Sequence, residues 1–256
     1  MAKVIAVVNQ KGGVGKTTTS VNLCACIATL GHKVLLIDID PQSNSTSGIG
    51  INKAKIKNSI YDVIINGSSI KDCYMKTMLD NLTIVPSAPE LSGAEVELVT
   101  VISRETKLKE ALEDIRDDFE YIFIDCPPSL GLLTINALTA SDNLMVPIQC
   151  EYYAMEGLAQ LINSVRLVRQ HLNPSLNFEG VLLTMYDSRT NLSDQVMAEV
   201  KKHFKEKVYK TVIPRNVRLS EAPSYGLPIT LYDPACTGAK AYHSLANEFL
   251  SQNNRG

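Results

Sequence analysis

The most informative stretch of this sequence is "VVNQKGGVGKTTTS", residues 7–20. Its end fits the phosphate-binding pattern G-x-x-x-x-G-K-[ST] with Gly15, Lys16 and Thr17, but Gln10 stands where the first glycine of that pattern belongs. A second lysine, Lys11, follows directly. The stretch comes after a strand-like run and opens a helical pattern, which is the context that a phosphate loop requires. The sequence therefore predicts a phosphate loop with an altered entrance.

The residue types of this loop suit the phosphates of a nucleotide. Gly12, Gly13 and Gly15 permit positive φ and let backbone N–H groups turn inward, where they and the helix N-terminus can hold phosphate oxygens. Lys16 can reach the β- and γ-phosphates, and the hydroxyl of Thr17 can ligate Mg²⁺. The alternative, a glycine-rich turn that only caps a helix, is disfavoured by the sequence G-K-T-T in this context.

Lys11 needs its own explanation, because Lys16 already serves the phosphates of its own subunit. One interpretation is a solvated surface lysine. The other is a side chain that points outward, to the phosphates held by a second copy of the chain. There it would neutralise leaving-group charge only when two subunits meet, as an arginine finger does.

Strand-like and helical patterns alternate along the whole chain. The strand-like runs are mostly apolar with little alternation, as expected of parallel strands covered on both faces. We therefore predict the α/β class, with one domain over residues 1–256 and a doubly wound, mostly parallel sheet with helices on both faces. The least regular region, 42–80, should insert between the second and third main strands. Predicted strands are 3–8, 33–38, 82–87, 121–126, 143–148, 179–185 and 208–214, and predicted helices are 17–30, 104–116, 153–171, 192–204 and 238–250.

Composition narrows the class of protein further. The 256 residues are 45% hydrophobic, enough for a sizeable core, and the formal net charge of −2 gives no global sign of nucleic-acid binding. Apolar runs are strand-sized, so we expect no transmembrane helix, and the N-terminus does not read as a secretory signal. The six cysteines form no C-x-x-C pair, which favours reduced, buried thiols in a cytosolic protein.

Three aspartates stand at the ends of predicted strands. Asp38 and Asp40 end an apolar strand beside the expected place of the phosphate loop, and Asp125 ends another. Strand residues two apart point to the same face, so Asp38 and Asp40 could share Mg²⁺ or its waters. The alternative is that the two merely cap the turn before Pro41.

Several motifs together resemble one family. "KGGVGKTT" (11–18) is the deviant Walker A motif of the ParA/MinD family of P-loop ATPases, and the resemblance covers essentially the whole chain. "VLLIDIDPQ" (34–42) looks like that family's second motif, and "YIFIDCPPSLG" (121–131) like its Walker B motif and second switch. "TMYDSRTNLS" (184–193) and "VIPRNVRLSEAPSYGLPI" (212–229) are similar to the chromosomal ParA (Soj) branch, in which Gln10 is usual.

The resemblance implies a P-loop NTPase fold of the deviant Walker type that binds ATP and Mg²⁺. In this family the lysine at the position of Lys11 reaches across a nucleotide-sandwich dimer, so the catalytic residues would be Lys11, Lys16 and Asp40. Asp40 would position or polarise the attacking water, Asp38 would lie nearer the metal shell, and Asp125 would contact Mg²⁺ through water, with Thr17 as a further metal ligand. The nucleotide-binding residues implied are Lys11, Gly12, Gly13, Val14, Gly15, Lys16, Thr17, Thr18, Met185, Pro214 and Asn216.

The identity of the base is suggested by a missing motif. GTPases usually carry N-K-x-D for guanine, and the single "NK" of this chain, Asn52-Lys53, lacks the aspartate. ATP is therefore favoured. In similar proteins the adenine edge meets a backbone carbonyl and an amide side chain after a late strand, the place that Pro214 and Asn216 occupy here; a plain turn is the alternative.

Basic residues are concentrated late in the chain. Between Arg189 and Arg218 there are eight Lys/Arg and three Asp/Glu, a local charge of +5 that leaves −7 for the rest of a −2 chain. A solvated helix face is one interpretation. The other is a surface that follows duplex DNA through its phosphates without reading bases, as the resemblance also implies. The candidate DNA-binding residues are Arg189, Lys201, Lys202 and Arg218.

These observations favour a DNA-partitioning ATPase of the cytoplasm and nucleoid. The resemblance implies that an ATP-bound homodimer binds non-specific double-stranded DNA. It also implies that a ParB-type centromere-binding protein stimulates slow hydrolysis, which releases the dimer from DNA. Its length resembles the chromosomal rather than the larger plasmid type. A MinD-like membrane-recruited ATPase would need a basic amphipathic C-terminal helix, which the tail "HSLANEFLSQNNRG" (243–256) does not provide. An iron–sulfur carrier on the same loop would need paired cysteines, whereas Cys126 and Cys150 stand apart.

Overall fold

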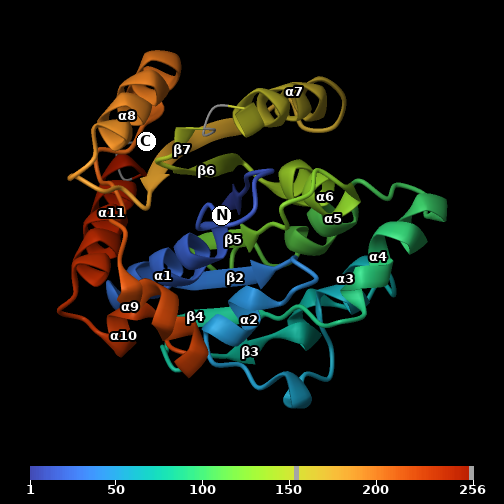
Figure 1. Cartoon of the computed structure of the whole chain (residues 1–256). Helices are drawn as coiled ribbons and strands as arrows, with labels where there is room; N and C mark the ends of the chain where they lie inside the picture. The colour runs from blue at the N-terminus through green and yellow to red at the C-terminus, as the bar shows by residue number, and fades with distance from the viewer. Residues whose placement is uncertain (153–155, 254–256) are drawn as a thin grey trace.

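The computed structural model describes residues 1–152 and 156–253. Seven strands form one sheet in the order β3-β4-β2-β5-β1-β6-β7, and every neighbouring pair is parallel except β3 with β4. The predicted doubly wound, mostly parallel α/β fold is confirmed (Figure 1). The strands are β1 (Lys3–Val7), β2 (Val34–Asp38), β3 (Met75–Lys76), β4 (Leu82–Val85), β5 (Tyr121–Asp125), β6 (Asn143–Gln149) and β7 (Asn177–Thr184).

Helices follow most of the strands, as the alternation of patterns predicts. Region 42–80 holds short elements between β2 and β4, which is where it was expected to insert. The α-helices are α1 (Lys16–Thr29), α2 (Asn44–Gly48), α3 (Ile60–Ile64), α4 (Leu91–Glu97), α5 (Lys107–Glu113), α6 (Leu132–Ala140), α7 (Glu156–His171), α8 (Asn191–Phe204), α9 (Val217–Glu221), α10 (Ile229–Tyr232) and α11 (Thr237–Asn253). Short 3-10 helices are η1 (Lys53–Lys55), η2 (Ile70–Cys73), η3 (Leu98–Thr100), η5 (Lys205–Lys207) and η6 (Ala222–Tyr225).

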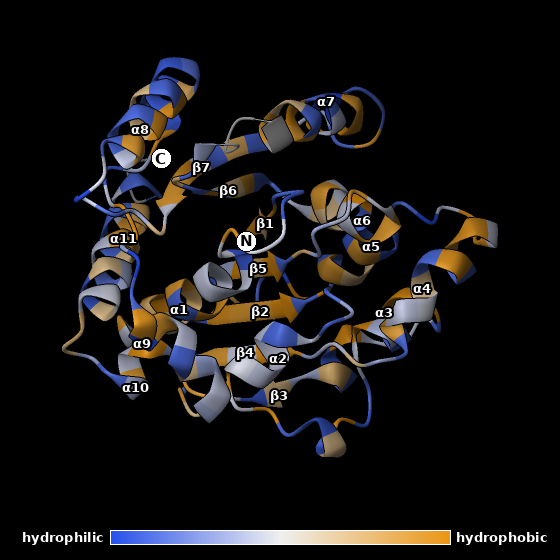
Figure 2. Ribbon diagram, in the orientation of Figure 1, coloured by the Kyte–Doolittle hydropathy of each residue, from blue (hydrophilic) through white to orange (hydrophobic). Residues whose placement is uncertain are grey.

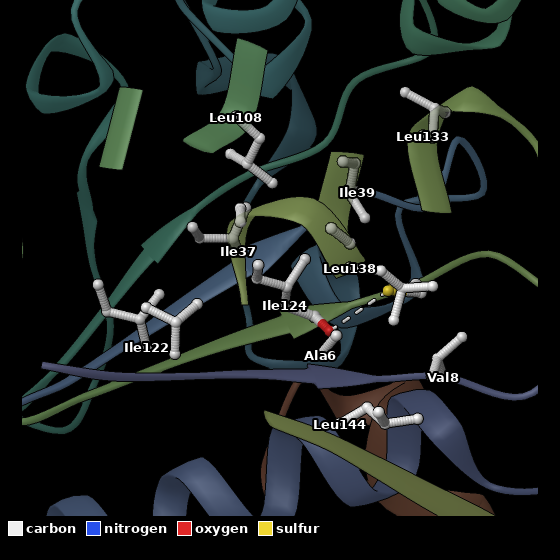
Figure 3. Close-up of a cluster of buried hydrophobic side chains, with 14 of the residues drawn as sticks. Ala6, Val8, Ile37, Ile39, Leu108, Ile122, Ile124, Leu133, Leu138 and Leu144 are labelled. Carbon is white, nitrogen blue, oxygen red and sulfur yellow. Dashed lines mark hydrogen bonds between the residues drawn. The ribbon is translucent and has the colours of Figure 1, made fainter. Parts of the chain in front are cut away.

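The sheet is covered on both faces, as the side chains of β1 show. Val4 and Ala6 belong to a buried cluster with side chains of α3, α5, α6, α7 and α8, whereas Ile5 and Val7 belong to a second cluster with α1 and α11. Figure 3 shows part of the first cluster, and in Figure 2 the central strands β2 and β5 are hydrophobic along their length. Successive strand residues therefore enter opposite cores, which explains the near-continuous apolar runs in the sequence.

The carboxyl ends of the parallel strands meet at one edge and position the site. β2 and β5 pair in register, with Asp38 opposite Asp125. β1 lies on the other side of β5 and leads into the phosphate loop at the same edge. This edge is where ligands bind in open α/β sheets.

Two predicted elements differ from the structure. The predicted strand 208–214 is wrong: the segment makes only isolated bridges beside β7, Val181 with Val208 and Tyr186 with Pro214. The carboxylate of Glu248 on α11 takes the N–H groups of residues 210 and 211 at 2.7 and 2.9 Å, and Pro214 has no N–H to donate, so no ladder forms. The helix predicted over 104–116 is shorter in the structure, where α5 begins at Lys107 and ends at Glu113.

The described parts of the other late helices agree with their predicted positions. Helix α7 begins at Glu156, and residues 153–155 of the predicted helix lie outside the described residues. None of the helices in the described ranges is long and apolar enough to cross a membrane.

Candidate nucleotide-binding site

The phosphate loop has the backbone that its glycines were expected to permit. Gly13 and Gly15 have φ of 74° and 87°, in the left-handed region that favours glycine, and α1 begins directly after Gly15. Gly12 has open space around it. Lys16 is only 7% exposed, and its ammonium donates to the carbonyl oxygen of Lys11 at 3.0 Å. The ammonium thus lies over the loop, at the N-terminus of a helix, where phosphate oxygens bind.

The charge state of Lys16 depends on its neighbours. Burial lowers the pKa of its ammonium, while Asp125, Cys126 and Asp40 act in the opposite direction. An anion at the loop would favour the charged form further, because an opposite charge nearby raises the pKa of a lysine. Lys16 is therefore suited to hold a phosphate group.

Asp125 is surrounded by hydroxyl groups. Its carboxylate accepts hydrogen bonds from Thr17 at 2.8 Å, from Ser20 at 2.9 Å and from Ser45 at 2.7 Å. The side chain is fully buried, and burial raises its pKa to about 6 although the three hydrogen bonds oppose the shift. The hydroxyl that was expected to ligate magnesium and the Walker B carboxylate are thus in direct contact.

Asp38 lies beside Asp125 on the neighbouring strand and is also fully buried. Burial, followed by the charge of Asp125, raises its pKa to about 7. Its carboxylate accepts the N–H and the hydroxyl of Thr46 at 2.8 and 2.7 Å and the N–H of Asp40 at 3.2 Å. Asp38 therefore holds the segment after β2 in place, and its oxygens are turned toward that segment.

The donor set fits a hard divalent cation. Two fully buried carboxylates with raised pKa values lie side by side, and a nearby divalent cation would offset their repulsion and favour their ionised forms. Among the described residues, no three His, Cys, Asp or Glu side chains cluster as a complete metal cage. This matches Mg²⁺, which commonly keeps waters and binds through one or two carboxylates plus substrate phosphates. Thr17 and Asp125 are the pair best placed to hold it.

Asp40 lies just beyond the end of β2, at 6% exposure. Its carboxylate accepts the N–H of Gln42 at 2.9 Å, and its carbonyl accepts the hydroxyl of Ser87 at 2.7 Å. Within residues 1–152 and 156–253, only Oδ1 of this carboxylate accepts a hydrogen bond. The position is fixed by the backbone around it, which is what a group that orients a water molecule requires.

Lys11 lies at the entrance of the loop, in an ion pair with Glu151 of its own chain. Its backbone N–H donates to the side chain of Asn9 at 3.0 Å. The side chain is 36% exposed, so it lies partly in solvent rather than under the loop. The geometry separates the two loop lysines, because Lys16 is buried and Lys11 is at the surface.

A cavity of about 300 Å³ adjoins the loop where the nucleoside was expected. Gly15, Thr18, Met185, Pro214 and Asn216 line it. The amide of Asn216 caps α9, accepting from the N–H of residue 219 at 3.4 Å, and donates to the hydroxyl of residue 237 at 2.7 Å. The structure thus brings the predicted base contacts together beside the predicted phosphate contacts, although Val14 itself is buried in the loop.

The predicted DNA-binding residues are exposed but do not form one cluster. Arg189 precedes α8, and its Nε and Nη2 donate to the carboxylate of Asp187 at 2.9 and 2.7 Å. Arg218 lies on α9 and pairs with Glu221 at 2.9 Å and with Asp233 at 3.5 Å. Figure 1 shows α8 and α9 apart, at different ends of α11. Lys201 and Lys202 are exposed on α8.

Sequence patterns alone did not identify several residues of the site. Ser20, Ser45 and Thr46 bond the buried carboxylates, and Ser87 holds the backbone of Asp40. The polar run "SNSTSG" (43–48) could have indicated these contacts, because several hydroxyl side chains shortly after an aspartate can donate hydrogen bonds to buried carboxylates. Glu151 carried no such signal, because its contact with Lys11 joins residues far apart in the chain.

The cysteines that an iron–sulfur carrier would need, and the apolar face of the C-terminal helix that a membrane-recruited ATPase would need, are buried in the protein core here. Cys126 and Cys150 are buried, and burial raises the pKa of both thiols, to about 11 for Cys150, which disfavours the thiolate that binds metal. The apolar side chains of α11, among them Tyr242 and Phe249, are buried in the second core against α1. The apolar face of this helix is therefore already covered.

Comparison with known proteins agrees with the geometry. A family model described as "AAA domain" matches residues 2–178. The chain is 62% identical over 248 residues to the sporulation initiation inhibitor protein Soj of Bacillus subtilis, covering 97% of this chain and 98% of that protein. It is 50% identical over 252 residues to the chromosome partitioning protein ParA of Myxococcus xanthus, covering 98% of this chain and 89% of that protein.

Among solved structures, a protein of Mycobacterium smegmatis is similar over nearly the whole chain. It is described as cobyrinic acid a,c-diamide synthase with bound ATP analogue and magnesium, and it superposes with a TM-score of 0.87 at 36% identity, covering 99% of this chain and 96% of that one. The identities to Soj and ParA are much higher and extend through the late motifs. The chain therefore belongs to the ParA/MinD family of deviant Walker A P-loop ATPases, on the branch of the Soj and ParA chromosome-partitioning proteins.

Proposed function

We propose that this protein is a Mg²⁺-dependent ATPase that partitions DNA, and that it works as one P-loop domain over residues 1–256. ATP closes a homodimer, the dimer binds duplex DNA without sequence preference, and hydrolysis stimulated by a ParB-type partner releases it. The observation that carries this proposal is the difference in burial between the two loop lysines. Lys16 is buried over its own loop, whereas Lys11 is at the surface of the entrance.

The chemistry of the site supports hydrolysis by placement and charge. Lys16 and the loop amides hold the phosphates, and Asp40 orients the attacking water. Thr17 and Asp125 would hold Mg²⁺, which would neutralise charge on the phosphates. A lysine from the second subunit adds positive charge where the leaving group develops negative charge. A monomer lacks the lysine of the second subunit, so its turnover is slow.

This proposal is tested by phosphate release as a function of protein concentration. A site completed by a second subunit should hydrolyse ATP with a specific activity that rises with protein concentration until the dimer is saturated. Chelation of Mg²⁺ should stop the reaction, and a ParB-type protein should accelerate it. A specific activity that is constant over a hundredfold dilution, well below and above the dimerisation range, would rule out the completed site.

Gly12→Val should still bind ATP but should no longer dimerise. Open space surrounds Gly12 and its φ is not in the left-handed region, so the chain's own fold accepts a side chain there. A β-branched side chain beside Lys11 would, however, block close approach of a second subunit. Light scattering with ATP should show a monomer.

Gly12→Ala is the graded control, because its single methyl group should weaken the dimer less than valine does. Thermal unfolding of both variants should remain close to that of the parent. A normal ATP-dependent dimer of Gly12→Val would contradict the face-to-face arrangement.

The proposed DNA surface joins basic residues from separate elements. Arg189 lies just before α8 and Arg218 lies on α9, and a dimer presents each of them twice. Carboxylates of the same chain pair with both guanidinium groups. These pairs fix the orientation of each guanidinium group and reduce the local positive charge. Contacts to phosphate need no base readout, so binding should be strong at low salt and weak at high salt. On this proposal the protein acts in the cytoplasm on the nucleoid.

Arg189→Glu and Arg218→Glu should each weaken DNA binding and leave ATP-dependent dimerisation intact. The slope of log affinity against log salt should fall by about one unit per lost phosphate contact in each subunit. Fluorescence anisotropy with duplex DNA across a salt series measures both effects. Asp187→Asn should act in the opposite direction, because it removes the carboxylate that pairs with Arg189.

Lys71→Glu is the matched control for these variants. Lys71 is 49% exposed and paired with Asp118, much as Arg218 is 54% exposed and paired with Glu221, but it lies outside the basic segment. If both arginine variants bind DNA like the parent, or if Lys71→Glu loses as much affinity, the DNA surface lies elsewhere.

A further inference from the structure

The last residue of β7, Thr184, is joined to the phosphate loop by a buried hydrogen bond. Its hydroxyl donates to the carbonyl oxygen of Val14 at 2.8 Å. Both residues are 2% exposed, so water hardly competes for this contact. A threonine hydroxyl carries one proton, and this bond uses it. Thr184 therefore holds one carbonyl of the loop in a defined direction.

The direction of that carbonyl determines where the next N–H of the loop points. A trans peptide unit is planar, with its oxygen and its N–H on opposite sides, and no peptide bond within residues 1–152 and 156–253 is cis. The Val14 oxygen faces Thr184, so the N–H of Gly15 points away from Thr184. Among the residues that the structure describes, this N–H has no acceptor. It is therefore free to bind a phosphate oxygen.

The loop benefits from this restraint because it is rich in glycine. Glycine has more backbone freedom to lose on ordering than any other residue. Gly12 and Gly13 have open space where a side chain would stand, whereas a Cβ on Gly15 would lie 3.6 Å from the methyl carbon of Thr184. The methyl group of Thr184 therefore lies next to the loop as well. A loop that is ordered before binding holds its ligand more tightly than one that must be ordered on binding.

The position of Thr184 is itself fixed by the sheet. Its carbonyl oxygen accepts the N–H of Cys150 at 3.0 Å, and β7 pairs with β6 as far as Gln149, which lies opposite Thr184. The chain turns directly afterwards, because Met185 has a φ of 50°, in the left-handed region that residues other than glycine rarely adopt. Such backbone strain clusters at functional sites. Thr184 and Met185 both line the cavity beside the phosphate loop.

We propose that Thr184 is a positioning residue of the nucleotide site, which orders the phosphate loop through the Val14 carbonyl and so raises the affinity of the loop for the phosphate chain. Thr184 acts on the loop and not on the nucleoside, although it lines the same cavity as Met185 and Asn216. This inference rests on the proposed function, since it takes the loop to be the site of the phosphates.

Thr184→Val is the main test, because valine has nearly the shape of threonine but no hydroxyl. The change leaves the Val14 carbonyl buried without its donor, so the affinity for ATP with Mg²⁺ should fall about tenfold in calorimetry. Thr184→Ser keeps the hydroxyl and should bind ATP within about threefold of the parent. Thr184→Ala removes the hydroxyl with a smaller side chain, so its comparison with serine decides the question if the valine variant does not fold.

Thr77→Val is the matched control, because it removes the same kind of bond at the edge of the sheet. The hydroxyl of Thr77, just after β3, donates to the carbonyl oxygens of Leu79 and Leu82 at 3.2 and 2.9 Å. Its loss should leave the ATP affinity equal to that of the parent. An equal loss of ATP affinity in Thr77→Val would overturn the proposal, and so would a serine variant that binds as weakly as the valine variant.

Inorganic tripolyphosphate separates an effect on the loop from a contact with the nucleoside, because it has the phosphates but no sugar or base. Its affinity is measured by competition with a fluorescent ATP analogue. Thr184→Val should lose the same factor in affinity for tripolyphosphate as for ATP. A loss for ATP alone would show that Thr184 binds the nucleoside directly, which contradicts the proposal.

Steady-state phosphate release gives a readout that a general loss of packing would not give. In Thr184→Val the KM for ATP should rise about tenfold, whereas kcat at saturating ATP should stay close to that of the parent. The reason is that Asp40, Thr17 and Asp125 are unchanged, so the bound complex keeps its reacting groups. A fall in kcat with an unchanged KM would refute a role in loop ordering.

The parent protein separates failure of this proposal from failure of the proposed function. If the parent binds neither ATP nor tripolyphosphate, the phosphate-loop assignment fails, and this proposal fails with it. If the parent binds ATP but tripolyphosphate does not compete, the affinity resides in the nucleoside and the proposal is overturned. If the parent binds both ligands and Thr184→Val binds them equally well, only the role of Thr184 is refuted.

Discussion

Lys16→Ala should abolish tight ATP binding. The residue Lys16 is 7% exposed, and its ammonium lies over the phosphate loop and donates to the carbonyl of Lys11 at 3.0 Å. The other lysine of the loop, Lys11, is paired with Glu151 at the entrance. Loss of a charge-assisted contact to phosphate is worth about 3 kcal/mol, or about a hundredfold in affinity. Isothermal titration calorimetry with Mg²⁺ and ATP measures the change directly.

Lys11→Ala is the informative comparison for this variant. Lys11 is partly exposed and paired with Glu151, so its removal should leave the affinity of the single subunit for ATP nearly unchanged while weakening the dimer. Lys16→Arg should bind more tightly than Lys16→Ala because it keeps the charge. An unchanged ATP affinity in Lys16→Ala would remove the phosphate-loop assignment.

Asp40→Ala should keep ATP binding and dimerisation but lose most turnover. The carboxylate lies just beyond the end of β2 and accepts the N–H of Gln42. Loss of a group that orients or activates water lowers the rate by about 10²- to 10⁴-fold. Rapid-quench measurement of a single turnover should show the slow step, and the variant should accumulate as a DNA-bound dimer with ATP.

Asp40→Asn separates the charge from the local fold. Its side-chain oxygen can still accept the N–H of Gln42, so the segment after β2 should keep its position, yet the negative charge is gone. Both variants should therefore be slow, and Asp40→Asn should be the more stable of the two. Hydrolysis near the parental rate in either variant would show that Asp40 does not position the water.

The phosphate loop and the strand-end aspartates could be predicted because their signals are local. Gly15, Lys16 and Thr17 follow each other in sequence, and a run such as residues 34–38 is buried on both faces, so it carries an unbroken apolar pattern. The parallel arrangement then brings Asp38 and Asp125 together without further information, because the carboxyl ends of neighbouring strands meet at one edge.

Helix α6 and the segment 208–214 could not be predicted correctly from local sequence patterns. Helix α6 is buried almost all round, so its sequence "LLTINALTA" (132–140) lacks the alternation of apolar and polar residues that marks an amphipathic helix. The segment 208–214 has the composition of a strand, but Glu248 of a distant helix takes two of its N–H groups. Contacts such as these, and the ion pair of Lys11 with Glu151, join residues far apart in the chain and leave no trace in a single sequence.

DNA binding with ATP, with ADP and without nucleotide, each across a salt series, tests the central claim most directly. An ATP-gated dimer should bind duplex DNA tightly only with ATP and Mg²⁺, with a steep negative slope of log affinity against log salt and little dependence on DNA sequence. Asp40→Ala should prolong that bound state. Equal binding in all three nucleotide states, or ATP-dependent binding with no salt dependence, would contradict an ATP-gated, phosphate-following dimer.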